Sequence, residues 1–223
     1  MINPSDDVLL VDKPAGWTSF DVVAKIRGFL RVQTGQRKVK VGHAGTLDPF
    51  ATGLLVILVG DACKRADQLL KLDKTYEFTV TLGATSTTGD TEGEIIENNA
   101  ASEPSQTDVE AAMARFRGGI TQTPPAYSAI KVGGKRAYEL ARAGKEVKLE
   151  PRKVTIHSLE IIEYTWPELR CRAHVSSGTY IRTLAEDIGL ALGVGGYCSQ
   201  LRRTEVDTFR ITDARTVESL TKY

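Results

Sequence analysis

The chain has 223 residues, 41% of them hydrophobic, and 29 Lys or Arg against 28 Asp or Glu. This length can bury a sizeable core, and the composition is typical of a globular protein, not of a disordered or collagen-like one. The longest apolar run, residues 54–59, is too short to span a membrane. Because no secretory signal opens the chain, we expect a cytoplasmic protein without a membrane partner.

The first part of the chain predicts three strands and two helices. Residues 8–11 predict a strand, and residues 18–19 cap a helix with an apolar stripe. Residues 54–59 are uniformly apolar and predict a buried strand, and residues 62–72 predict a short helix. Residues 76–82 alternate between apolar and polar side chains, which is typical of another strand.

The middle of the chain is polar before a helix is predicted. Residues 83–106 are acidic and favour a loop with a short hairpin. Thr107 and Glu110 match a capping box, and Gly118 stands where a helix would end.

The last part of the chain predicts β structure around one more helix. Residues 154–162 and 169–175 predict strands, and an amphipathic helix is expected between Ile181 and Gly193. Residues 206–211 predict a final strand, followed by a small helix capped near Thr212. Because strands and helices mix without regular βαβ alternation, we predict an α+β fold with a central mixed, largely antiparallel sheet flanked by helices.

The charges are unevenly distributed along the chain. Residues 25–40 contain six cations and no acid, and residues 131–153 contain eight cations against three glutamates. Residues 90–110 contain seven acids and no base. This asymmetry predicts a basic face for a polyanion and an acidic edge turned away from it, although a charge run can also be a plain solvated surface.

A basic arm is predicted at about residues 123–153. Its first part, residues 123–138, combines paired prolines, a Gly-Gly pair and interleaved Lys, Arg and Tyr. This composition favours a mobile segment that contacts RNA backbone and bases. A plain exposed loop is the alternative.

Asp48 is the candidate catalytic carboxylate. It lies in the turn-rich segment 42–55, which contains three glycines and leads directly into the buried strand. A short loop that enters a buried strand can hold a reactive side chain at its mouth. The alternative is that Asp48 caps a turn before Pro49.

Arg182 is the second unusual residue. It falls in the first turn of a predicted helix, where the helix dipole disfavours a cation. This broken rule indicates a specific anionic partner, which could be Asp48 or a phosphate, unless the arginine faces solvent.

The sequence contains no signature of a cofactor or a metal site. The segment 42–55 is neither a Walker loop nor a GxGxxG after a strand. The three histidines and three cysteines lack metal-ligand spacing, and His174 is interpreted as a strand-surface histidine. We therefore predict chemistry without a cofactor.

Six motifs together resemble the TruB family of tRNA pseudouridine synthases. They are spread in the family's order over nearly the whole chain, and Gly-His-Ala-Gly-Thr-Leu-Asp-Pro is the most specific of them. The motifs are residues 11–19, 42–55, 74–76, 123–138, 177–182 and 201–204.

The resemblance implies a role for each matching residue. Asp48 would be the catalytic aspartate, Arg182 would pair with it, and Tyr76 would stack on the target base and take part in removing the C5 proton. Leu201 would line the uracil pocket, and His43 would fill space in the RNA loop.

Further substrate contacts are expected from residues in the other motifs. Lys13 belongs to a motif that supports the active-site loop and is counted with the substrate-binding residues, as is Tyr180. Lys131, Lys135 and Arg136 would contact RNA from the arm.

The resemblance implies isomerisation of uridine to pseudouridine at position 55 of tRNA, with the T-loop and T-stem as partner and a monomeric enzyme. The carboxylate would attack C1′, stabilise an oxocarbenium-like centre or abstract the C2′ proton. A non-catalytic RNA chaperone and a uracil-releasing glycosidase are the alternatives. The glycosidase would want a second carboxylic acid, and the motifs contain none.

Family members commonly continue into a C-terminal RNA-binding module of the PUA type. We expect either a naturally short form or a truncated chain without this module, organised as a single catalytic domain over residues 1–223. Because fewer RNA contacts would remain, we expect tRNA binding to be weaker and more sensitive to salt than in longer family members.

Overall fold

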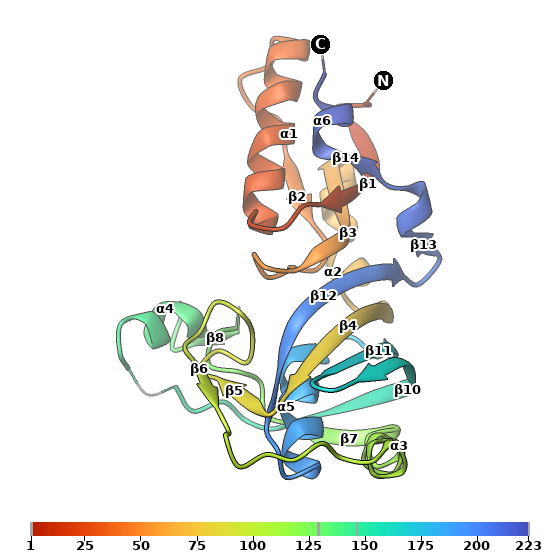
Figure 1. The fold of residues 1–223 in the computed structure, drawn as a ribbon. Helices are drawn as coiled ribbons and strands as arrows, with labels where there is room; N and C mark the ends of the chain where they lie inside the picture. Colours follow the sequence, from red (N-terminus) through yellow and green to blue (C-terminus); the bar gives the residue numbers. More distant parts are fainter. Residues whose placement is uncertain (1, 129, 146, 223) are drawn as a thin grey trace. The chain divides into compact units, whose positions relative to one another are not determined.

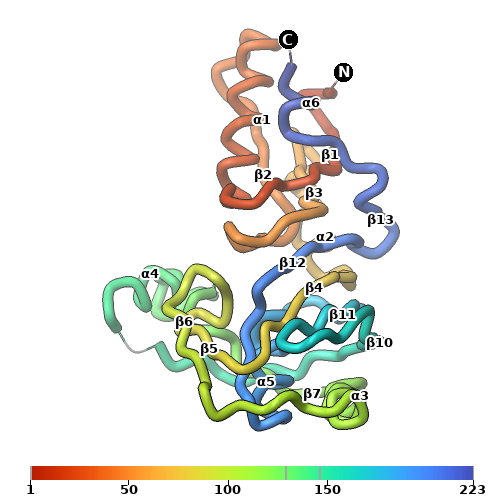
Figure 2. Tube along the Cα trace, viewed as in Figure 1, coloured from red at the N-terminus to blue at the C-terminus, as the bar shows by residue number. Residues whose placement is uncertain are grey.

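The computed structural model describes residues 2–128, 130–145 and 147–222. The chain divides into two compact units (Figure 1, Figure 2). The first unit comprises Met1–Tyr76 and Arg202–Tyr223, and the second comprises Glu77–Leu201. Two strands, β4 (Lys74–Leu82) and β12 (Gly196–Val206), belong partly to each unit.

The first unit is built on a mixed sheet in the strand order β14-β1-β3-β12, with β2 on β3 and β13 on β12. Strand β1 pairs antiparallel with β3, whereas β12 runs parallel to β3 and pairs Arg202 with Thr52. The remaining strands of this unit are β1 (Asp6–Lys13), β2 (Val41–His43), β3 (Thr52–Gly60), β13 (Phe209–Arg210) and β14 (Arg215–Thr216).

Helix α1 (Ser19–Thr34) packs against β2 and α6 in the first unit (Figure 1). Thr18 caps it through a reciprocal capping box with Asp21, which satisfies backbone N–H groups at the helix start. The shorter helices of this unit are η1 (Asp61–Arg65), α2 (Ala66–Leu70), η2 (Ile211–Asp213) and α6 (Val217–Leu220).

Strand β3 forms the centre of the core in the first unit. Its six apolar residues at positions 54–59 are fully buried. Leu54, Val56 and Leu58 pack with Ala44, Ala62 and Val206 in one hydrophobic cluster. The loop that precedes β3 is therefore attached to the most buried strand of this unit.

The second unit contains a largely antiparallel sheet in the order β12-β4-β11-β10-β7 and two small hairpins. Its helices are α3 (Gln106–Ala114), α4 (Ala137–Arg142) and α5 (Ile181–Ala191). Its remaining strands are β5 (Ala84–Ser86), β6 (Ile95–Glu97), β7 (Gly118–Gln122), β8 (Lys131–Val132), β9 (Lys135–Arg136), β10 (Arg152–Thr165) and β11 (Glu168–Val175).

The predicted α+β class with a mixed, largely antiparallel sheet is confirmed. Two local predictions are wrong. Helix α3 is capped by Ser105, whose hydroxyl accepts from the backbone N–H of Asp108, and not by Thr107. Gly118 begins β7 instead of ending the helix. The predicted strand at 206–211 is borne out in part: Val206 ends the long strand β12, and Phe209–Arg210 form the short strand β13, which pairs back onto it.

Within the part of the chain that the structure describes, no helix combines the length and the hydrophobicity needed to cross a bilayer. The segments at 62–72 and 83–106 follow the predictions more closely. The first forms η1 and α2, and the second contains the β5–β6 hairpin.

Candidate active site

Asp48 lies in the loop that joins β2 to β3, residues 44–51, in the first unit. Its side chain is partly exposed, and its carbonyl accepts a hydrogen bond from the N–H of Ala51 at 3.2 Å. The carboxylate therefore sits on a tight turn directly before the buried strand.

The residues on either side of Asp48 are held by residues from the start of the chain. The Ser19 hydroxyl donates to the carbonyl of Leu47 at 3.1 Å and accepts from its N–H at 2.8 Å. The carbonyl of Pro49 accepts from Lys13 Nζ at 3.2 Å and from the Gly16 N–H at 2.8 Å. The backbone is therefore fixed immediately before and after Asp48.

Lys13 is a fully buried ammonium group beneath this loop. Besides the carbonyl of Pro49, its Nζ donates to the carbonyls of Pro14 at 2.9 Å and Trp17 at 2.6 Å. Burying a charge is costly unless hydrogen bonds compensate it, and these three acceptors do so. Contact of Lys13 with a substrate stays a prediction.

Arg203 contacts the same segment from strand β12 and was missed in the sequence. Its side chain is buried, and it donates from Nε to the carbonyl of Leu54 at 2.7 Å and from Nη2 to the carbonyl of Gly45 at 3.0 Å. The Arg-Arg pair at 202–203 was the only available signal, and it does not tell which arginine is buried.

His43 is the last residue of β2 and immediately precedes the loop. Burial, followed by the positive charge of Arg203, lowers the pKa of His43, so the imidazole is neutral at pH 7. Its Nδ1 is buried and has no hydrogen-bond partner among the described residues. An orphaned buried nitrogen of this kind calls for an explanation, and a bound partner can supply one.

Tyr76 lies in the part of β4 that belongs to the first unit, and its side chain is buried. Contacts between β4 and β12 hold its neighbour Thr75. The Thr75 hydroxyl donates to Glu205 at 2.9 Å, and the Thr204 hydroxyl donates to the carbonyl of Thr75 at 3.3 Å. The ring of Tyr76 therefore projects from a fixed backbone.

Lys74 lies two residues before Tyr76 and is also buried. Its Nζ donates to the carbonyls of Leu70 at 2.8 Å and Leu72 at 2.5 Å. Burial, followed by the charge of Arg203, lowers the pKa of Lys74 to about 8.

Arg182 lies in the first turn of α5, in the second unit, and its side chain is buried. It donates to the carbonyls of Thr88 at 2.8 Å and Tyr127 at 2.7 Å and forms an ion pair with Asp90 at 3.2 Å. Arg182 thus has an anionic partner within its own unit, Asp90, which is neither Asp48 nor a phosphate. The predicted pair with Asp48 would join the two units and stays a prediction.

Asp90 corrects the prediction of an acidic edge over residues 90–110. Only 2% of it is exposed, because a tight turn folds it inward. Its Oδ1 accepts from the Thr88 hydroxyl at 2.6 Å and from the N–H of Glu92 at 3.0 Å. The six other acids of residues 90–110 are exposed, as expected.

Tyr180 caps the start of α5 without a side-chain capping bond of its own. The amide of buried Gln122, at the end of β7, accepts from the Tyr180 N–H at 3.0 Å and donates to its carbonyl at 3.2 Å. Gln122 therefore fixes the residue that leads into Arg182. Nothing in the local sequence of Gln122 indicated this role.

The remaining predicted residues lie in the second unit. Leu201 is buried in β12, whereas Lys131, Lys135 and Arg136 are exposed on the β8–β9 hairpin. Gly133 and Gly134 form its turn with φ angles of 58° and 85°, which only glycine adopts readily at both positions. Ala129 and Glu146, within the predicted arm, lie outside the described residues.

Among the described residues, no group of three or more His, Cys, Asp or Glu side chains could hold a metal ion. The three cysteines are free thiols, and burial raises the pKa of Cys171 to about 12. His174 lies beside His157, with ring centres 4.8 Å apart.

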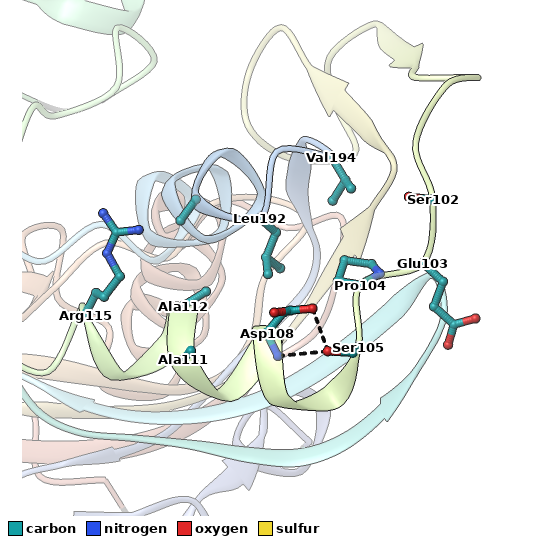
Figure 3. A pocket seen from close by; sticks show the side chains of 11 residues that line it. Ser102, Glu103, Pro104, Ser105, Asp108, Ala111, Ala112, Arg115, Leu192 and Val194 are labelled. Atoms are coloured by element: carbon teal, nitrogen blue, oxygen red, sulfur yellow. Dashed lines mark hydrogen bonds between the residues drawn. The ribbon is translucent and has the colours of Figure 1, made fainter.

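A cavity of about 460 Å³ lies in the second unit between α3 and the residues that end and follow α5 (Figure 3). Ser105 and Asp108 face it but are hydrogen-bonded to each other, and Leu192 and Val194 form its opposite wall. None of the predicted site residues is among the described residues that line it.

The fold defines the class of protein first. The chain is similar to the crystal structure of a Cbf5-Nop10-Gar1 complex, with a TM-score of 0.75 and 30% identity, over 99% of this chain and 54% of that chain. It is also similar to an H/ACA RNP bound to a substrate RNA containing 2′-deoxyuridine, with a TM-score of 0.71 and 28% identity, over 97% of this chain and 52% of that one. The chain spans about half the length of these proteins, and its architecture is the pseudouridine synthase fold.

Sequence comparison narrows the class to a family. The model of the TruB family pseudouridylate synthase N-terminal domain matches residues 31–181, and that of the tRNA pseudouridylate synthase B C-terminal domain matches residues 182–223. The chain belongs to the TruB family.

Three relatives are each named tRNA pseudouridine synthase B. The protein of Opitutus terrae is 43% identical over 99% of this chain and 90% of its own length. That of Thermobifida fusca is 45% identical over 97% and 74%, and that of Phocaeicola vulgatus is 46% identical over 97% and 92%.

Proposed function

We propose that this chain converts uridine to pseudouridine at position 55 in the T-loop of tRNA. The observation that carries the proposal is the fixed loop around Asp48. Ser19 is hydrogen-bonded to the preceding residue, Leu47, and Lys13 and Gly16 are hydrogen-bonded to the following residue, Pro49. A single carboxylate held this rigidly before a buried strand suits a reaction in which position decides the rate. Family membership and the names of the relatives support the same activity.

The reaction is an isomerisation and needs no redox partner. The N1–C1′ bond breaks, the uracil turns within the pocket, C5 joins C1′, the C5 proton leaves and N1 takes up a proton, so the composition of the RNA does not change. The uridine must first be flipped out of its loop, so the site has to hold a detached base throughout. No electron or group is supplied from outside the RNA.

Asp48 acts in its ionised form at the ribose. It attacks C1′, stabilises positive charge there, or takes the C2′ proton, and each role needs a charged and aimed carboxylate. In this proposal Arg182 pairs with Asp48 when RNA is bound. Its ion pair with Asp90 and its bonds to Thr88 and Tyr127 preset the guanidinium for that role.

Tyr76 and Leu201 hold the flipped base. Both side chains are largely buried, which suits an apolar pocket that excludes water. The Tyr76 ring stacks on uracil, and its hydroxyl takes part in removing the C5 proton once C5 is joined to C1′. A flipped base is commonly read by such stacking on an aromatic side chain.

His43 and the basic hairpin bind the surrounding RNA. His43 is neutral at pH 7 and has a buried Nδ1 without a partner among the described residues, which suits insertion among the bases of the T-loop. Lys131, Lys135 and Arg136 are exposed and would bind phosphates of the T-stem. Tyr180 would line the RNA side of α5.

We further infer that both units together form one catalytic domain, because the proposed site takes Asp48 and Tyr76 from the first unit and Arg182 and Leu201 from the second. The proposal includes a monomeric, cytoplasmic enzyme.

The test measures tritium release from a T-loop RNA whose uridine carries tritium at C5. The wild type should release tritium and leave no free uracil, and D48N should release none while binding the RNA equally well. RNA binding without release by the wild type would contradict the proposal and favour a chaperone. Free uracil would instead indicate a glycosidase.

A further inference from the structure

Arg203 is a buried cation to which the proposed mechanism gives no role. Its side chain is only 1% exposed and is the largest of the fully buried side chains among the described residues. A guanidinium cannot lose its charge inside a protein, so its burial must be compensated by contacts. Those contacts indicate what the residue does.

Both hydrogen-bond acceptors of Arg203 flank the loop that carries Asp48. Gly45 lies near the start of residues 44–51, and Leu54 lies three residues after their end. The Nε and Nη2 groups of a planar guanidinium have a fixed separation, so they hold the two carbonyls at a fixed distance. Arg203 therefore closes the base of the Asp48 loop.

Two glycines of the same segment are fitted to Arg203. Gly45 has a φ of +105°, and a Cβ there would come within 3.3 Å of Arg203 Nη1. Gly53 has a φ of +100°, and a Cβ there would lie 2.3 Å from the Arg203 carbonyl oxygen. Both the backbone and the side chain of Arg203 thus approach the segment where only glycine leaves room.

The charge of Arg203 has no carboxylate partner in the part of the chain that the structure describes; its acceptors are carbonyls. Its field therefore acts on the neighbouring groups. Together with burial, which is the larger cause, it lowers the pKa of both His43 and Lys74. A positive potential at the base of the loop also favours anions nearby.

We propose that Arg203 is a positioning residue for the isomerisation, which sets the shape of the Asp48 loop by tying Gly45 to Leu54. The inference rests on the proposed function, because the loop matters only if Asp48 is the reacting group. Arg203 touches neither substrate nor reacting atoms in this account. It acts through the backbone that carries Asp48.

Arg202 is the matched control. It is the neighbouring residue on the same strand, but its guanidinium forms an ion pair with Asp12 at 2.8 Å, and its side chain is 41% exposed. Substituting lysine at each position keeps the charge and removes the two-pronged donor. If both variants form pseudouridine more slowly, the cause is a general disturbance of strand β12. If only the variant at position 203 is slower, the cause is the altered shape of the Asp48 loop.

The experiment compares single-turnover pseudouridine formation and RNA dissociation constants for wild type, R203K and R202K. R203K should react about a hundredfold more slowly, since a small misplacement of the reacting group has this effect, with an unchanged dissociation constant. R202K should behave as wild type. A wild-type rate in R203K, or an equal loss in R202K, would overturn the proposal.

Two further readouts do not depend on activity. Hydrogen exchange of the Leu47 amide should be faster in R203K than in R202K, because that amide lies within the loop. The pKa of His43, followed by NMR, should stay as in wild type in R203K and rise in R203M, which removes the charge. Unchanged exchange of the Leu47 amide in R203K would overturn the positioning role, whether or not the wild type forms pseudouridine. An inactive wild type with faster exchange in R203K would contradict the proposed function but not the effect of Arg203 on the loop.

Discussion

The Asp48 loop owes its rigidity to a few side chains that bond to its backbone, and Ser19 is the smallest of them. Its hydroxyl accepts from the N–H of Leu47 and donates to the carbonyl of the same residue. Because these backbone groups are buried, leaving them without a hydrogen-bond partner costs more free energy than an ordinary hydrogen bond contributes to stability.

S19A should therefore destabilise the protein by about 1 to 3 kcal/mol, the cost of leaving buried polar groups unpaired. It should also slow pseudouridine formation, since Leu47 adjoins Asp48. Urea unfolding measures the first effect and single turnover the second. S102A, at an exposed serine, is the control, and equal stability of the two variants would contradict the role given to Ser19.

Lys74 should make stability depend on alkaline pH. Its pKa is lowered from 10.5 to about 8 in the folded protein. Between these values the unfolded chain binds a proton that the folded chain does not, so the contribution of Lys74 to stability improves as pH rises. Below pH 8 the full penalty of burying the charged group is present.

The stability advantage of K74M over wild type should accordingly fall as pH rises from about 8 to about 10. Urea unfolding of both proteins across this range measures the difference, in which the titration of all other groups cancels. A difference that is constant with pH would show that Lys74 does not titrate in this window.

Asp90 is the buried partner of Arg182, and D90N removes one charge of that pair. Breaking a buried ion pair costs about 3 to 5 kcal/mol, because the remaining charge is left uncompensated. D90N should therefore lower the unfolding midpoint in urea and reduce tritium release. E94Q, in the same acidic run but exposed, should change neither, and equal stability of D90N and E94Q would contradict the role of Asp90.

At the scale of elements, patterns within one segment predicted structure well. The capping residues and apolar stripe of α1, and the uniform hydrophobicity of β3, are local features with one physical explanation each. Strand β12 was missed because charged residues occupy its centre. Arg203 can be buried there because the carbonyls of Leu54 and Gly45 accept its hydrogen bonds. These acceptors lie 149 and 158 residues away in sequence, so no local pattern predicts them.

The candidate site follows the same division. Asp48, His43 and Tyr76 were selected through motifs, as was Lys13 as a residue that supports the loop, but Ser19, Arg203 and Asp90 were not predicted to hold the site or its surroundings. Ser19 bonds to Leu47, 28 residues away in sequence, and Lys13 bonds to Pro49, 36 residues away. Most of the sequence of the second unit separates Asp90 from Arg182, with which it forms an ion pair. Such pairings depend on tertiary structure, which no local pattern encodes.

Helix α5 offers a test at this scale. Its N-cap residue, Tyr180, is held by Gln122, so Q122A should leave the N–H and carbonyl of Tyr180 without these partners. Hydrogen exchange of the Leu184 amide, which bonds to the Tyr180 carbonyl, should become faster. Q200A, at an exposed glutamine, should leave the exchange unchanged, and slow exchange in Q122A would contradict the anchoring role.

At the scale of the whole molecule, the first unit is assembled from both ends of the chain. Residues 202–223 return to residues 1–76, a closure that composition and periodicity could not reveal. The proposed site needs residues from each unit, and β4 and β12 belong partly to both. Tyr76 on β4 and Leu201 on β12 are the last residues of their units before the chain passes from one unit to the other.

The most direct test of the central claim maps pseudouridine in an unmodified tRNA transcript after incubation with the enzyme. Carbodiimide labelling followed by primer extension reports the position of each pseudouridine. We expect a single new stop that reports position 55 with wild type and none with D48N. No stop with wild type, a stop at another position, or an undiminished stop with D48N would contradict it.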